Sequence, residues 1–149
     1  MLWVDNNEVG DGGGQFVDVV ITEWALASYM NLKHQRVFRE EEYKSRLRPD
    51  AELLKDGFPS PHTKLNNNKF WSPAVMRGEA IKGGFKMKWH NVGDGKVQLR
   101  LLVVIWDGIA FLCEAYVKDS DRVDPRMIAK LKIRVRDIAQ KRVVTRGKL

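Results

Sequence analysis

The chain has 149 residues, enough for one domain with its own hydrophobic core. Its 44% hydrophobic and 30% charged residues exclude wholesale disorder, and the longest apolar run, Leu101–Trp106, is too short to cross a bilayer. The net charge of +7 is concentrated in residues 60–102 (8 basic, 2 acidic) and 126–149 (9 basic, 1 acidic), which favours a polyanionic partner: nucleic acid or an acidic protein segment.

The N-terminal half predicts a strand followed by helices. Residues 1–14 are rich in glycine and predict a flexible tail in front of a single domain that spans 15–149. Residues 16–22 are β-branched and predict a strand, and Thr22 is the expected N-cap of an amphipathic helix that runs to Val37. A charged helix over 38–48 and a short helix over 49–57, ended by Gly57, then predict a helical hairpin against a sheet.

The second half predicts three antiparallel strands and a final helix. Alternation marks strands near 85–90, 97–105 and 109–117, and Asp107-Gly108 predicts a tight turn between the last two. Asp124 at the N-cap and Pro125 at the first helical position predict the start of the last helix. The expected fold class is α+β: an antiparallel sheet packed on an N-terminal helical hairpin, with a C-terminal helix.

Polarity divides the predicted sheet into two faces. Opposite residues of an antiparallel pair share a face. We expect Lys88 beside Gln98, Lys86 beside Arg100, and Arg100 beside Glu114. The polar face then collects Lys86, Lys88, Gln98, Arg100, Glu114 and Tyr116, whereas the apolar face that meets the helices collects Phe85, Met87, Trp89, Leu99, Leu101, Cys113 and Ala115.

Two interpretations of the polar face remain open. Its cations and tyrosine suit a phosphate backbone, because Lys and Arg neutralise phosphates and tyrosine stacks on a base or donates its hydroxyl. The same pattern is also typical of an ordinary solvated sheet face. His90 is a candidate general acid or base beside Lys88, although a surface histidine at a turn has the same appearance.

The residues from about 64 to 136 resemble the RelE/ParE superfamily of bacterial toxins, nearest to its HigB-like and phage-derived members. The resemblance is carried by Lys64-Leu65 with Phe70-Trp71 and Arg77, by the strand from Gly84 to Trp89, and by the segment from Phe111 to Arg134. Lys86 stands where that family usually has arginine, and Asp119 where it usually has a second lysine. The resemblance implies a RelE-like fold for the whole domain.

The resemblance also implies a function: the toxin of a toxin–antitoxin pair that cleaves mRNA on the ribosome without a metal ion and so inhibits translation. A 2′-hydroxyl attacks the adjacent phosphate, and cations stabilise the charge that develops. The implied catalytic residues are Lys86, Lys88, Arg100, Tyr116, His90 and Arg77, and the implied RNA-binding residues are Lys64, Gln98, Lys118, Arg122, Lys130 and Arg134.

The expected partners are a cognate antitoxin protein, the ribosome and its mRNA, with no membrane and no small-molecule cofactor. One cysteine excludes an intrachain disulfide and thiolate metal sites, and the N-terminus lacks the pattern of a signal peptide, so we expect a cytoplasmic protein. Two alternatives stay open: a ParE-like binder that poisons DNA gyrase without nuclease chemistry, and a non-toxic basic module that binds nucleic acid or protein.

Overall fold

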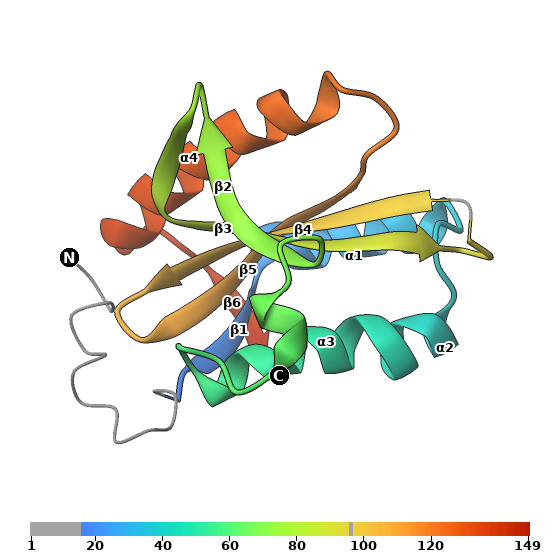
Figure 1. The fold of residues 1–149 in the computed structure, drawn as a ribbon, viewed down its shortest axis with the longest axis horizontal. Coiled ribbons are helices and arrows are strands. Elements are labelled where there is room, and N and C mark those ends of the chain that lie inside the picture. Colours follow the sequence, from blue (N-terminus) through green and yellow to red (C-terminus); the bar gives the residue numbers. More distant parts are fainter. Residues whose placement is uncertain (1–15, 96) are drawn as a thin grey trace.

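The computed structural model describes residues 16–95 and 97–149, so the predicted tail over 1–14 lies outside the described residues (Figure 1). A six-stranded sheet forms the middle layer. The strands are β1 (Asp18–Thr22), β2 (Trp71–Met76), β3 (Glu79–Val92), β4 (Val97–Trp106), β5 (Ile109–Val117) and β6 (Thr145–Lys148). The helical elements are α1 (Glu23–His34), α2 (Glu40–Glu42), the π-helical η2 (Tyr43–Leu47), α3 (Arg48–Glu52), the 3₁₀ turns η3 (Leu53–Asp56) and η4 (Thr63–Asn66), and α4 (Val123–Ala139).

The sheet is mixed, in the order β2-β3-β4-β5-β1-β6. β1 runs parallel to β5, with Val19 opposite Ala110, and the other neighbours are antiparallel. The prediction of an antiparallel, RelE-like sheet on an N-terminal helical hairpin is therefore wrong. The α+β class itself holds, but β1 enters the sheet beside β5, and β2 and the exposed β6 add two strands to the four predicted from sequence patterns.

α1 lies along the edge of β5 rather than in a hairpin with the next helix. The Thr22 side chain accepts a hydrogen bond from Ala25 N–H (3.1 Å), which confirms the predicted N-cap, and its hydroxyl donates to Leu112 O (2.7 Å). One turn later Ser28 Oγ accepts from Ala115 N–H (2.9 Å). The helix thus continues the line of β1, and its side chains satisfy the part of the β5 edge that β1 leaves unpaired.

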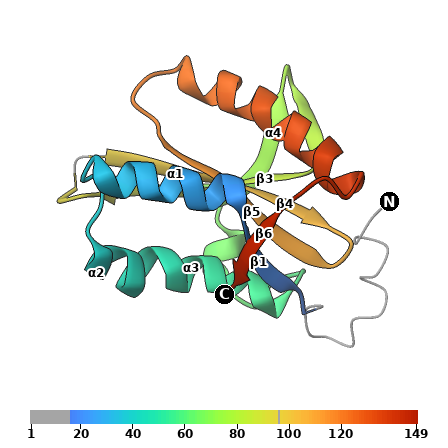
Figure 2. The ribbon, with the colours of Figure 1, turned by 180° about the vertical axis from the view of Figure 1, so that it is seen from behind.

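The helical stretch from α2 to η3 covers one face of the sheet, and α4 covers the other (Figure 2). Leu47, Ala51 and Leu54 pack with Met87 and Leu99 on the first face. Ile128 and Leu131 of α4 pack with Leu102 and Val104 on the second. Among the described residues, no helix is long and apolar enough to cross a membrane.

The predicted faces are right for the sheet's centre, although the predicted pairs are shifted. Lys88 lies opposite Arg100, and Arg100 opposite Tyr116, a shift that preserves side-chain alternation. A bulge in the β4–β5 pairing reverses the alternation within β5. Cys113 consequently packs under α4, and the prediction that it lies on the opposite face with Met87 is wrong.

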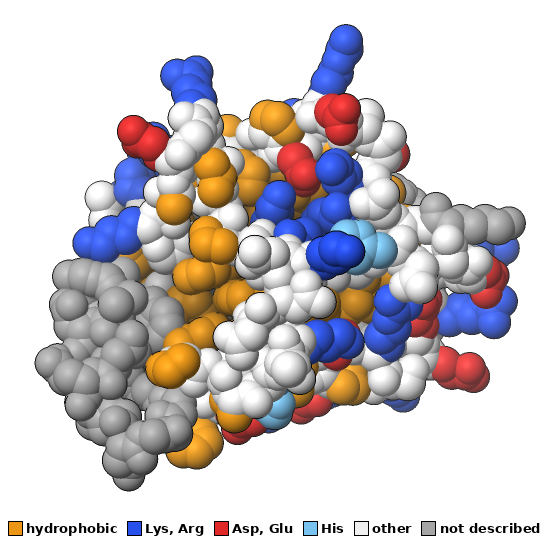
Figure 3. Space-filling model, viewed as in Figure 1, with side chains coloured by type: hydrophobic (Ala, Val, Ile, Leu, Met, Phe, Trp, Pro, Cys, Tyr) orange, Lys and Arg blue, Asp and Glu red, His pale blue; other side chains and the backbone are white. Residues whose placement is uncertain are grey.

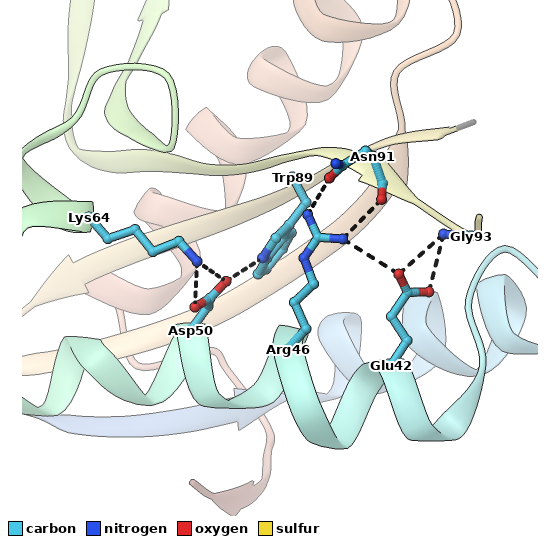
Figure 4. A network of polar contacts seen from close by, with 7 residues as sticks. All are labelled: Glu42, Arg46, Asp50, Lys64, Trp89, Asn91 and Gly93. Atoms are coloured by element: carbon cyan, nitrogen blue, oxygen red, sulfur yellow. Dashed lines mark hydrogen bonds and ion pairs between the residues drawn. The ribbon is translucent and has the colours of Figure 1, made fainter. Parts of the chain in front are cut away.

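A buried carboxylate ties α3 to the sheet (Figure 4). Asp50, 8% exposed, accepts hydrogen bonds from Lys64 Nζ (2.9 Å to each oxygen) and from the indole N–H of Trp89 (2.8 Å). Arg46 of η2 donates to Asn91, and Glu42 accepts from Gly93 N–H at 3.1 Å. Gly93 has a φ of +61°, and a Cβ there would lie 2.5 Å from Val37 O, so the turn requires glycine.

Replacing Asp50 tests how much this junction contributes to stability. We expect Asp50→Ala to lower the free energy of unfolding by about 1–3 kcal/mol, because it leaves the buried Trp89 N–H without an acceptor. The matched control, Glu40→Ala, breaks only the exposed Lys44–Glu40 pair and should cost less than about 1 kcal/mol. Urea unfolding followed by tryptophan fluorescence measures both, and equal losses would contradict a structural role for Asp50.

Candidate nucleic-acid interface

Four cations converge where β3, β4 and β5 meet the first turn of α4. We call this group the basic cluster: Lys86, Lys88, Arg100 and Lys118, together with Tyr116 and Asp124. Lys88, Arg100 and Tyr116 form one row across three neighbouring strands. Asp124 joins the cluster from α4 and pairs with Lys86 Nζ (3.7 Å) and Lys118 Nζ (3.6 Å). One carboxylate therefore faces several positive charges.

Asp124 has a different role from the one predicted from the sequence. α4 begins at Val123, its N-cap is Arg122, and no side chain caps it, so the predicted N-cap role of Asp124 is wrong. Its carboxylate instead accepts a hydrogen bond from the Tyr116 hydroxyl. Burial acts to raise the Asp124 pKa, but the Tyr116 hydrogen bond and the nearby lysines outweigh it and hold that pKa below its ordinary value.

Tyr116 keeps its proton at neutral pH. Burial raises its pKa far above the ordinary value, and the hydrogen bond to Asp124 raises it further. The hydroxyl is therefore a hydrogen-bond donor in this site, and its partner is the Asp124 carboxylate.

Lys88 is half-buried and has no carboxylate bonded to it among the described residues. Its Nζ donates to Asn68 O and to Ser72 Oγ (3.0 Å), both neutral acceptors. Burial lowers its pKa, and repulsion by Lys86 and Arg100 lowers it further. An anion placed beside Lys88 would relieve that repulsion, which makes this lysine the natural centre of a phosphate site.

Arg100 is only 4% exposed, an unusual burial for a guanidinium group. One terminal nitrogen donates to Gln98 Oε1 at 2.9 Å, while Nε has no hydrogen-bond partner among the described residues. Burial lowers its pKa and the Asp124 carboxylate opposes that shift, but an arginine remains charged at neutral pH. The group thus supplies a fixed positive charge whose hydrogen-bonding capacity is only partly used.

The polar face of the sheet is partly covered. α4 packs over Leu102 and Val104 on this face, while the two β3 lysines of the basic cluster are half-buried. Glu114 is buried at 7% and bonds to Arg134 (2.7 Å), whose guanidinium stacks 4.2 Å from the Trp24 ring. Glu114 and Arg134 therefore hold α4 on the sheet, and Arg134 is committed to this structural pair.

The remaining predicted residues lie in three places. His90 and Lys64 line a groove that Lys88 also lines, and Figure 3 shows Lys and Arg side chains gathered around a histidine on this side of the molecule. Arg77 lies elsewhere, at the β2–β3 turn with a φ of +53°, where it lines a separate cavity. Arg122 and Lys130 are exposed at the start and in the middle of α4.

Comparisons with known proteins add no assignment to this geometry. No protein-family model and no curated protein matches the sequence.

The pairing of Asp124 with its cations predicts a pH-dependent stability. Because its folded pKa is lowered, Asp124 stabilises the fold above the ordinary carboxyl pKa of about 3.9, and this contribution is lost as the pH falls through the folded value. Asp124→Asn should therefore be less stable than the wild type at pH 7, and the gap should close in acid. Urea unfolding from pH 7 to pH 3 measures this, with Asp119→Asn at an exposed position as control. A gap independent of pH would contradict the pairing.

Proposed function

We propose that the protein is an endoribonuclease that cleaves mRNA on the ribosome and inhibits translation as the toxin of a toxin–antitoxin pair in the cytoplasm. The observation that carries the proposal is the convergence of Lys86, Lys88 and Arg100 on one partly exposed point beside a protonated tyrosine. Support comes from this cluster and from the sequence resemblance of its strands, and not from the topology of the sheet.

The cluster and the neighbouring His90 supply the groups that RNA transesterification needs. The 2′-hydroxyl of one nucleotide attacks the adjacent phosphorus, a 2′,3′-cyclic phosphate forms, and the 5′ oxygen leaves. Lys88 contacts the phosphate. His90 beside it is the candidate base for the 2′-hydroxyl proton, because its Nε2 donates to a backbone carbonyl and its Nδ1 has no partner among the described residues. Arg100 and Lys86 stabilise the charge on the phosphoryl oxygens. Tyr116 is the candidate donor of a proton to the leaving oxygen.

The electrostatics also favour a bound anion over an empty site. Asp124 is one carboxylate among four cations, and repulsion by Lys86 and Arg100 adds to burial in lowering the pKa of Lys88. A phosphodiester would supply the missing negative charge in a partly desolvated setting, where each charge-assisted hydrogen bond is stronger than at an open surface. The ribosome would supply what the cluster lacks, the in-line orientation of the RNA.

Cell-free translation with primer extension tests the proposal. The wild type should produce discrete cuts in translated mRNA. Lys86→Ala should lower the cleavage rate about 10²–10³-fold, because it removes a cation that stabilises the transition state. The matched control is Lys82→Ala, which removes an exposed lysine from the same strand in a separate cavity.

Two results would contradict the proposal. The first is intact mRNA with the wild type, and DNA breaks in a gyrase assay would then identify the ParE-like alternative. The second is equal cleavage by the Lys86→Ala and Lys82→Ala variants.

A further inference from the structure

A groove extends from the basic cluster along the side of Lys88 that faces away from Arg100 and from its strand partner Tyr116. Its volume is about 310 Å³, and it lies between the loop after η4 and the outer part of β3. We call it the Lys69 groove; it is lined by Arg46, Lys64, Asn67, Lys69, Phe70, Lys88, Trp89, His90 and Asn91. The lining holds five basic side chains and two carboxamides but no acidic residue.

Two of the five basic side chains already have structural partners. Lys64 pairs with Asp50 at 2.9 Å, and Arg46 pairs with Glu42 at 3.6 Å while donating to Asn91. The other three differ: Lys69 makes no ion pair with any described residue, Lys88 bonds only to neutral acceptors there, and His90 bonds only to a backbone carbonyl. The spare positive charge of the groove therefore lies along the rim formed by Lys69, His90 and Lys88.

The wall that carries Lys69 is held rigidly. Asn67 Oδ1 accepts from Lys69 N–H (2.9 Å), and Asn67 O accepts from both Phe70 N–H and Trp71 N–H at 2.9 Å. His90 Nε2 lies 2.6 Å from Lys69 O, so this nitrogen must carry a proton. Because these hydrogen bonds already order the loop, a ligand that binds here loses little further conformational entropy from it.

His90 has a ring nitrogen to offer a ligand. With Nε2 donating to the Lys69 carbonyl, Nδ1 has no hydrogen-bond partner among the described residues. It accepts a hydrogen bond when the ring is neutral and donates to a phosphate when the ring is charged. The side-chain oxygens of Asn67 and Asn91 already accept hydrogen bonds from Lys69 N–H and from Arg46, and their exposed amide nitrogens can donate to unstacked base edges.

We propose that the Lys69 groove binds the single-stranded RNA that flanks the phosphate at the basic cluster. Lys88 lines the groove and also belongs to the cluster, so one strand can pass from one to the other without a break. The carboxamides and the histidine beside the lysines favour a nucleic acid, because they can pair with base edges while the lysines pair with phosphates. The inference rests on the RNA ligand of the proposed function but not on cleavage.

Fluorescence anisotropy with labelled oligouridylates of about four and about twelve nucleotides tests the inference, since single-strand sites of this kind span about 4–16 nucleotides. The wild type should bind the longer oligonucleotide more tightly. Lys69→Glu should weaken binding of the longer one about tenfold at low salt and reduce its salt slope by at least ~0.7 for the lost phosphate contact, with the shorter one unchanged. Lys44→Glu is the matched control, because Lys44 is an exposed lysine that lines a different cavity.

Three outcomes of the binding experiment test whether the Lys69 groove binds RNA. Loss of the length-dependent gain in Lys69→Glu, with circular dichroism and melting unchanged, supports the inference, and Lys69→Ala should show a smaller loss in the same direction. Equal binding by Lys69→Glu and Lys44→Glu overturns it. Poly-glutamate that binds the wild type as tightly as RNA, with the same sensitivity to Lys69→Glu, overturns the assignment to RNA. Failure to cut mRNA with these binding results intact would refute the proposed function alone.

Discussion

The central strands β4 and β5 are covered on both faces, and this constraint determines where the protein can carry charge. Almost every residue between Leu99 and Ile105 is withdrawn from water, with α3 on one side and α4 on the other. A charged side chain within such strands must be paired or must lie where a covering helix ends. Glu114 meets the first condition through Arg134, and Arg100 meets the second beside the first turn of α4.

The basic cluster contains interactions that lower the stability of the folded state. Burying Arg100 with an unpartnered nitrogen and crowding Lys88 between two cations both oppose folding, and one carboxylate on α4 offsets them only in part. Functional sites commonly carry such local costs, because a ligand rather than the fold supplies the missing partner. The network of Asp50, Lys64 and Trp89 differs from the basic cluster, because both oxygens of its buried carboxylate have hydrogen-bond donors and it holds α3 in place.

Elements that depend on neighbouring residues along the chain could be predicted from local patterns. Thr22 as N-cap, Gly57 at the helix end and the Asp107-Gly108 turn follow from local backbone preferences, and the structure has them all. Alternation placed Lys86, Lys88 and Arg100 on one face, and it survived a wrong register because a shift of two residues leaves the face unchanged. The sequence was therefore sufficient to predict that these cations share a face of the sheet.

The arrangement of those elements could not be predicted from local patterns. The parallel β1–β5 pair, the position of α1 on the sheet edge and the addition of β6 depend on contacts between distant segments, which no local pattern records. Asp124 has the sequence context of a helix cap, yet its partner is Tyr116, and Lys69 is an ordinary loop lysine until the fold sets it beside His90. Local chemistry fixed which residues carry charge and where turns form, whereas long-range packing fixed which of those charges meet.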